Sequence, residues 1–590
     1  MLKPRLNNHR NLIDISGIWK FKIDKNNEGE KKGWNEGFSA DSEIAVPGSW
    51  NEQLDNLDLL HYVGKAWYTK DIFVPKNFKD KKLWIRFDSV DYHSKVWIND
   101  RLVGTNDFGY LPFDFEITEF VQCGKENLIV LSVDNQLSDD TIPQGINTHY
   151  YVDEKRPRDE TFPAARFDFP PNGGIHRPVY IYTTSLIFIE DIAVKTKLTG
   201  PSSSKVLLQL NINENISCEL VVNISDNNSI FNEKFKYNGN SADIEFEVNN
   251  IDLWGLGNPN LYKLTVTLFN ENEEVDSYSL QIGFREIEVK NKQILLNGKP
   301  VYMQGFGKHE DFPVFGKGFN YQSLVKDFSL MKWIKANSFR TSHYPYAEEV
   351  LEMADREGFL VIDEVPAVSL DFRKVNGGTL KSHKEFTKKL IARDKNHPSV
   401  IAWALGNEPN LVGNPDYFNG EAEKYWKEIF QNARELDSTR LLTVPNCQKA
   451  GINDPVFLFS DFISINRYYG WYEHPGQIEY GVEVLEKEMD EIWNKYHKPI
   501  LMTEFGTDTI AGEHSISDQM FTEEYQSKFI EKYIELLRSK DYVIGEHVWN
   551  FADFRTPQHF RRVIMNRKGV FTRTREPKLA AFKLKELWSK

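Results

Sequence analysis

Cysteine is scarce in this chain of 590 residues, which contains only Cys123, Cys218 and Cys447. Three cysteines so far apart in sequence exclude the disulfide framework of a small secreted domain and a zinc ribbon. Long apolar runs are also missing, because no stretch approaches the 18 uncharged residues that a membrane-spanning helix needs. Residues 1–8 lack the apolar core of a signal peptide, so we expect a cytoplasmic protein.

Positive charge is in deficit, with 72 Lys and Arg against 86 Asp and Glu and a net charge of -14. A general nucleic-acid binder or a protein that adheres to anionic membranes needs a basic surface, so we expect neither kind of partner. Aromatic residues, in contrast, make up 13% of the chain. This abundance is typical of β-rich cores, which is the plainer explanation, and also of proteins that stack rings on sugars.

The pattern of apolar residues divides the chain into three parts. Residues 1–183 contain short strands separated by turn residues and no long helical period, which predicts a jelly-roll β-sandwich. Residues 184–282 contain alternating strands with turns rich in Asn and Ser, which predicts an immunoglobulin-like β-sandwich. Residues 283–590 alternate short apolar runs with amphipathic stretches, which predicts a C-terminal (β/α)₈ TIM barrel. The eight apolar runs are 301–303, 338–341, 360–362, 400–405, 441–444, 462–465, 500–503 and 543–548.

Two glutamates follow apolar runs of this barrel. Glu408 comes after the fourth run and Glu504 after the seventh, and these two strands face each other across the mouth of an eight-stranded barrel. Barrel enzymes bind their substrates at this end, and a pair of opposed carboxylates is what cleavage of a glycosidic bond requires. One such glutamate could simply bind loop amides, but two in equivalent places favour catalysis.

A basic segment, residues 555–578, follows the eighth run and contains eight Lys and Arg but one acid, Glu576. Its first part belongs at the catalytic end of the barrel, where basic residues suit a carboxylate or phosphate group of a substrate. A solvated run of charge is the alternative explanation. A metal site formed by His309, Asp311 and His343 has no recognised ligand spacing, so we expect neither metal nor cofactor.

Several motifs in the chain resemble those of known glycosidases. Residues 406–409 (Gly-Asn-Glu-Pro) and 503–506 (Thr-Glu-Phe-Gly) resemble the acid/base and nucleophile motifs of retaining glycoside hydrolases. The order of the three domains is that of the second glycoside hydrolase family. Within this family, the chain resembles the β-glucuronidases at residues 306–311, 340–346, 392–399, 466–472, 548–554 and 566–568.

The resemblance implies a role for each matching residue. Glu408 would be the general acid/base, Glu504 the nucleophile, and Asn407 a ligand of the sugar 2-hydroxyl. Asn566 and Lys568 would bind the C6 carboxylate of glucuronic acid. The other residues expected to line the sugar site are Asp168, His309, Asn466, Tyr468, Tyr472, Trp549 and Arg562.

The function implied by the resemblance is retaining hydrolysis of small-molecule or oligosaccharide β-D-glucuronides by a homodimer or homotetramer. A β-galactosidase or a β-galacturonidase on the same scaffold is an alternative. A non-catalytic carbohydrate-binding protein is a further one, against which the two intact glutamate motifs speak. The stretch 366–386 is short where some bacterial relatives carry a lid, which predicts an open site that accepts large aglycones.

Overall fold

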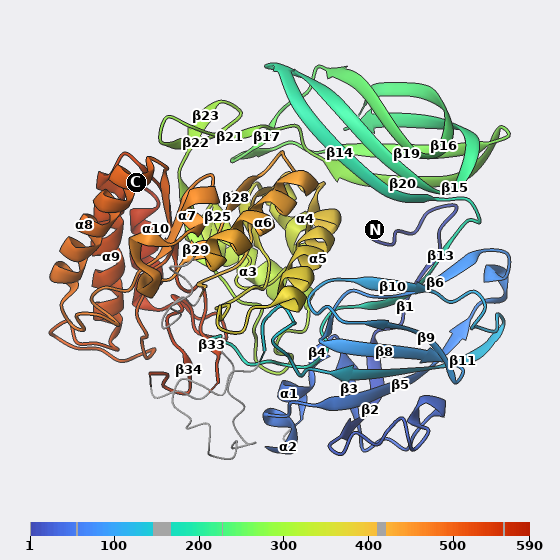
Figure 1. Ribbon diagram of the computed structural model, residues 1–590, viewed down its shortest axis with the longest axis horizontal. Coiled ribbons are helices and arrows are strands. Elements are labelled where there is room, and N and C mark those ends of the chain that lie inside the picture. The colour runs from blue at the N-terminus through green and yellow to red at the C-terminus, as the bar shows by residue number, and fades with distance from the viewer. Residues whose placement is uncertain (1, 55–56, 146–166, 227, 410–419, 558–560) are drawn as a thin grey trace.

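The computed structural model describes residues 2–54, 57–145, 167–226, 228–409, 420–557 and 561–590. It contains two β-sandwich domains, blue and green in Figure 1, and a barrel coloured from yellow to red. Both sandwich domains contact the barrel, as in the hydrogen bonds from Arg177 to the carbonyl of Pro345 and from Trp254 to that of Asp355. The three-part fold class predicted from the sequence is therefore confirmed.

The N-terminal domain is built from two antiparallel sheets, of four strands (β1-β13-β6-β10) and six strands (β3-β2-β5-β11-β8-β9), with a small third sheet (β4-β12-β7). Alternation explains the packing, since Trp19 and Phe21 are buried in β2 while the alternate residues Ile18 and Lys20 are exposed. The elements are β1 (Leu12–Asp14), β2 (Gly17–Asp24), β3 (Ser42–Val46), β4 (Gly48–Ser49), α1 (Trp50–Gln53), α2 (Leu57–Leu60), β5 (Lys65–Val74), β6 (Lys82–Phe87), β7 (Val90–Asp91), β8 (His93–Ile98), β9 (Arg101–Asn106), β10 (Phe113–Glu116), β11 (Lys125–Asp134), β12 (Gly174–Ile175) and β13 (Val179–Thr184).

The second domain contains two strands that are much longer than the short ones expected. Its β15 has 23 residues and β16 has 21, and their pairing shifts register between Asn211 and Ile216. The first half of β15 pairs with β14 and the second half pairs with β19. The long strand β15 therefore connects these two neighbouring strands within one sheet. The elements are β14 (Ile189–Gly200), β15 (Ser203–Ser225), β16 (Ser229–Asn249), β17 (Trp254–Gly255), β18 (Asn258–Pro259), β19 (Tyr262–Asn270) and β20 (Glu273–Ile282).

The barrel strands form one parallel sheet in the order β28-β27-β26-β25-β24-β32-β31-β30-β29. The fifth strand is broken at Val444 into β28 and β29, which are the two ends of this order. Because β28 pairs with β27 and β29 pairs with β30, this broken strand closes the ring. The strands are β24 (Met303–Gly307), β25 (Ser338–Arg340), β26 (Leu360–Glu364), β27 (Val400–Ala404), β28 (Leu441–Thr443), β29 (Pro445–Asn446), β30 (Ile463–Asn466), β31 (Ile500–Glu504) and β32 (Val543–Val548).

The first barrel strand lies further along the chain than the run 301–303 suggested. Val301 belongs to a small antiparallel sheet, and the barrel strand contains two glycines that add nothing to an apolar pattern. Both are needed, because a Cβ atom at Gly305 would lie 1.9 Å from the carbonyl oxygen of Ser338, and one at Gly307 would lie 2.5 Å from the ring of Trp549. The small sheet consists of β21 (Ile287–Lys290), β22 (Gln293–Leu296) and β23 (Lys299–Val301).

Helices connect the barrel strands and cover the outside of the ring (Figure 1). Among the described helices, none is both long and apolar enough to cross a bilayer. The helices are α3 (Tyr321–Trp333), α4 (Glu348–Glu357), α5 (Gly377–Asp394), α6 (Glu421–Leu436), α7 (Val456–Phe459), α8 (Ile478–Tyr496), α9 (Glu523–Ser539) and α10 (Leu579–Leu587).

Candidate active site

The two glutamates expected to carry the chemistry lie at the same end of the barrel. Glu504 is the last residue of β31 and is almost fully buried. Glu408 follows β27 in a left-handed backbone conformation with φ of 47°, and its N–H donates to the carbonyl of Pro445 in the neighbouring strand. A positive φ is uncommon for a residue other than glycine, so this turn is held by its surroundings. Both side chains are thus fixed at strand ends.

A hydrogen-bond network connects the two carboxylates. Arg340, at the end of β25, forms an ion pair with Glu504 and a 3.4 Å contact with the amide oxygen of Asn407. Asn466, at the end of β30, donates to Glu408 at 2.9 Å and lies 3.3 Å from the same oxygen of Asn407. Four strands of the barrel therefore contribute to one polar cluster.

Burial raises the pKa of both glutamates, because it disfavours the charged form of each carboxyl group. At Glu504, the ion pair with Arg340 and a 2.7 Å hydrogen bond from the hydroxyl of Tyr468 oppose this rise. Glu408 has no such cation in contact among the described residues, and the amide of Asn466 is its hydrogen-bond donor. When the pair carries a single negative charge, the direct contact with Arg340 places that charge on Glu504 and leaves the proton on Glu408.

A second polar cluster lies in the hairpin after β32, formed by β33 (Phe554–Arg555) and β34 (Met565–Asn566). Lys568 is buried, forms an ion pair with Asp508, and donates to the hydroxyl of Tyr472 at 2.7 Å. Arg562 donates to Asp508 at 3.1 Å and makes two hydrogen bonds to Asp168, of 2.6 and 3.2 Å. The predicted carboxylate ligands thus form a charge-balanced cluster with two aspartates.

Part of the basic segment is structural. Arg555 and Arg573 both contact Glu52 of the N-terminal domain, at 2.7 and 3.0 Å. Arg575 pairs with Asp327, and Lys578 with Asp553. The predicted excess of basic charge is therefore largely compensated by acids elsewhere in the chain, which the local sequence does not reveal. Arg562 and Lys568, in contrast, both pair with Asp508, and Arg562 shares Asp168 with Asn566.

The N-terminal domain reaches this site through residues 167–169. Asp168 accepts a 2.7 Å hydrogen bond from the amide of Asn566. The ring of Phe169 lies 5.3 Å from that of His309 and 4.6 Å from the ammonium of Lys317, which also lies 4.1 Å from the ring of Tyr344. These cation–π contacts hold the backbone next to Asp168 against the barrel. Burial lowers the pKa of Lys317 to about 8.

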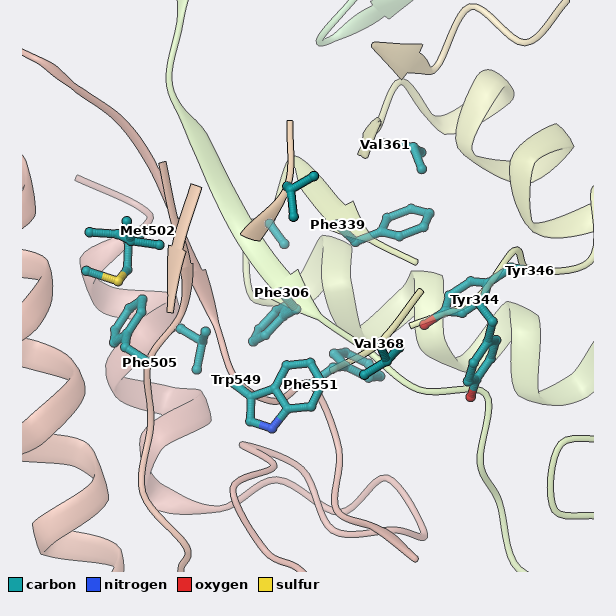
Figure 2. Close-up of a cluster of buried hydrophobic side chains, with 14 of the residues drawn as sticks. Phe306, Phe339, Tyr344, Tyr346, Val361, Val368, Met502, Phe505, Trp549 and Phe551 are labelled. Carbon is teal, nitrogen blue, oxygen red and sulfur yellow. The ribbon is translucent and has the colours of Figure 1, made fainter. Parts of the chain in front are cut away.

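The remaining aromatic residues of the site pack around His309 and His343. Trp549 follows β32 and stacks on His343 with ring centres 4.9 Å apart, and its other neighbours include His309 at 5.4 Å. Figure 2 shows Trp549 at the edge of the buried cluster that contains Phe306. The Nδ1 atom of His309 forms a 3.1 Å hydrogen bond with the hydroxyl of Tyr344. Burial lowers the pKa of His309 well below its ordinary value, which favours the neutral imidazole. Its Nε2 atom is buried without a protein partner in the described chain.

The structure brings all twelve expected site residues into this connected set: Asp168, His309, Asn407, Glu408, Asn466, Tyr468, Tyr472, Glu504, Trp549, Arg562, Asn566 and Lys568. Sequence reasoning missed three charged residues of the site, Arg340, Glu364 and Asp508. The strand-end rule could have found Arg340 and Glu364, since each ends a barrel strand. Within the described ranges, no group of three or more His, Cys, Asp or Glu side chains could hold a metal ion.

Comparison with known proteins assigns a family. The chain matches the sugar binding domain of glycosyl hydrolases family 2 at residues 12–185, a second family 2 model at 187–285, and the family 2 TIM barrel domain at 287–590. It is 39% identical to a beta-glucuronidase of Paenibacillus borealis, over 100% of this chain and 98% of that protein. It is 36% identical to the beta-glucuronidase of Canis lupus familiaris, over 100% of this chain and 92% of that protein.

A solved structure of the β-glucuronidase from Ruminococcus gnavus in complex with D-glucuronic acid is similar over the whole chain. The TM-score is 0.92 at 36% sequence identity, covering 100% of this chain and 99% of that one. The same enzyme in complex with uronic isofagomine also gives a TM-score of 0.92. From the three family models and these relatives, the chain belongs to glycosyl hydrolase family 2.

Proposed function

We propose that the protein is a retaining β-D-glucuronidase that releases D-glucuronic acid from a glucuronide. The observation that carries this proposal is the pairing of the two polar clusters: a carboxylate pair at one side of the site, and Lys568, Arg562 and Asn566 at the other. The side chains of Lys568, Arg562 and Asn566 are suited to binding a sugar carboxylate, and the two glutamates to cleaving the glycosidic bond. The full-length likeness to β-glucuronidases supports the same substrate.

In the first step, the carboxylate of Glu504 attacks C1 of the sugar and forms an ester bond, while the bond from C1 to the aglycone oxygen breaks. Glu408 gives its proton to that leaving oxygen. In the second step, Glu408 takes a proton from water, whose oxygen attacks C1 and releases Glu504. The amide oxygen of Asn407 contacts Arg340 and Asn466, the residues that bind the two carboxylates, and this position supports a role for Asn407 in binding the 2-hydroxyl. No cofactor enters either step.

The pH dependence of the reaction follows from these roles. Activity requires an ionised Glu504 and a protonated Glu408, so kcat/KM should follow a bell with its alkaline limb set by Glu408. Because burial raises the pKa of Glu408, this limb lies above the ordinary range of a glutamate. Glu408→Ala should remove the alkaline limb for a substrate with a good leaving group, such as 4-nitrophenyl β-D-glucuronide. Added azide should then restore turnover and yield the β-glucuronyl azide, and an unchanged pH profile would contradict the assignment.

Substrate choice is tested by comparing four 4-nitrophenyl glycosides: the β-D-glucuronide, β-D-galacturonide, β-D-glucoside and β-D-galactoside. We expect the glucuronide to be cleaved with the highest kcat/KM, because it alone combines the gluco configuration with a carboxylate at C6. Faster cleavage of the galactoside would favour a β-galactosidase, and faster cleavage of the galacturonide a β-galacturonidase. No cleavage of any of the four would support a carbohydrate-binding protein.

Three further predictions concern the size of the substrate, the assembly and the location of the protein. The segment between β26 and α5 is short and is bound to the N-terminal domain, as in the 2.8 Å hydrogen bond from the backbone N–H of Asp371 to the side-chain oxygen of Gln144. We propose that this leaves the site open to glucuronides with large aglycones or to oligosaccharides. That the protein forms a homodimer or homotetramer, and that it is located in the cytoplasm, stay predictions.

A further inference from the structure

The cations proposed to bind the substrate carboxylate already have anionic partners. Lys568 is paired with Asp508, and Arg562 contacts both Asp508 and Asp168. Counting only direct contacts, the two cations Lys568 and Arg562 are therefore balanced by two anions, Asp508 and Asp168. Adding the carboxylate of a uronate would place three anions against these two cations in a largely buried pocket. An unbalanced charge is costly at such a place, so the binding of a uronate calls for the release of one aspartate.

The two aspartates are held differently. Asp508 has a side-chain exposure of 1%, and it accepts hydrogen bonds from Lys568, Arg562 and the backbone N–H of Arg567. Asp168 has a side-chain exposure of 37%, and in the described chain its hydrogen-bond partners are the side chains of Arg562 and Asn566. Leaving its position returns Asp168 to water, whereas moving Asp508 would strand a buried ammonium. Asp168 is thus the exchangeable anion.

Asp168 also occupies the position that a sugar carboxylate needs. One of its oxygens, Oδ2, accepts from Asn566 at 2.7 Å and from Arg562 at 2.6 Å. We propose that Asp168 fills the carboxylate site of the empty enzyme, and that the carboxylate of the substrate displaces it from Asn566 and Arg562 while Asp508 stays on Lys568. This inference rests on the proposed function and adds the event by which the substrate enters its site.

The exchange needs little more than a side-chain rotation. The neighbouring Phe169 is held by Lys317 and His309, so the backbone of this segment stays in place. Once released, Asp168 lies beside the sugar, where it is free to bind hydroxyl groups. A carboxylate must take the place of Asp168, whereas a neutral group brings no charge with which to do so and leaves the ion pair of Asp168 and Arg562 intact. Removing the charge of Asp168 should therefore strengthen the binding of an acid more than that of a neutral sugar.

The test uses two ligands with the same hydroxyl groups, D-glucuronate and its neutral analogue D-glucuronamide. Isothermal titration calorimetry at constant ionic strength gives the ratio of their dissociation constants, amide over acid, for the wild-type protein and for Asp168→Asn. Lost contacts to hydroxyl groups affect both ligands and cancel in the ratio. We expect the ratio to rise about tenfold in the variant, because the carboxylate no longer competes with a charged group.

The matched control is Glu52→Gln, which removes one negative charge of the same domain from Arg555 and Arg573 without touching Asn566. Its ratio should equal that of the wild type. A crystal structure with D-glucuronate should show Asp168 out of hydrogen-bond distance of Asn566, with Asp508 still on Lys568. An unchanged or lower ratio in Asp168→Asn, or an intact contact between Asp168 and Asn566 beside the bound sugar, overturns the exchange. If the wild type neither binds D-glucuronate nor cleaves glucuronides, the proposed function fails as well.

Discussion

Glu504→Gln should lower kcat for 4-nitrophenyl β-D-glucuronide by about four orders of magnitude or more, as is typical when a catalytic nucleophile is removed. The amide has nearly the shape of the carboxylate and can still accept a hydrogen bond from Tyr468, but it cannot form the ester with C1. Arg340 keeps Glu364 as its second anionic partner, so the fold of the site should survive the change. Initial rates at saturating substrate measure the effect.

Two measurements separate lost chemistry from lost structure in this variant. The variant should keep the affinity of the wild type for D-glucuronate within a few fold and should unfold at nearly the same temperature. In the wild-type enzyme, 2-deoxy-2-fluoro-β-D-glucuronyl fluoride should release fluoride and label one peptide, the one that contains Glu504. A label on another residue, or activity of the variant within tenfold of the wild type, would remove Glu504 as the nucleophile.

Lys568→Ala should lower kcat/KM for the glucuronide by at least about 30-fold. Truncating one partner of a buried charge pair costs roughly 2–5 kcal/mol, and here both the substrate carboxylate and Asp508 lose their ammonium partner. The 4-nitrophenyl β-D-glucoside, which has no carboxylate, should be cleaved at nearly the rate of the wild type. The preference for the charged over the neutral sugar therefore falls, and the ratio of the two kcat/KM values measures it.

The neighbouring Arg567→Ala is the matched control for Lys568. The guanidinium of Arg567 donates to the carbonyl of Val563 at the surface, and its backbone N–H, which binds Asp508, is kept in the variant. Removing this cation should leave the sugar preference unchanged. Equal losses on both sugars in Lys568→Ala would assign the lysine a structural role, and a large loss in Arg567→Ala would show that the general charge of the segment matters more than the position of Lys568.

The sequence was sufficient to predict those site residues whose position depends on a single barrel strand. Glu408 and Glu504 are recognisable because each comes directly after a buried strand of the barrel, and the ring of strands brings such positions together. Asp508 could not be assigned in this way. Its partners, Arg562 and Lys568, come from a different loop, and nothing near Asp508 in the sequence indicates that it will pair with them.

The pairs between domains were also beyond the sequence. The contacts of Glu52 with Arg555 and Arg573 join segments about 500 residues apart, and they turn what reads as free positive charge into a domain interface. The glycines of β24 hid the first barrel strand for a related reason, because the close approach of Ser338 and Trp549 is a property of the packed barrel. The local sequence pattern shows which residues are polar or apolar. Contacts with residues distant in the sequence determine whether a charged residue belongs to the site or to a domain interface.

The reach of residues 167–169 into the barrel has a consequence for recombination between members of this family. A barrel transplanted onto the sandwich of a relative would keep both glutamates, yet its anion site would be completed by a foreign segment. Productive chimeras should therefore inherit residues 167–169 together with Lys317 and the loop that carries Arg562 and Asn566. The residues that determine substrate choice come from both domains and must be exchanged together, so a chimera joined at the domain boundary would separate them.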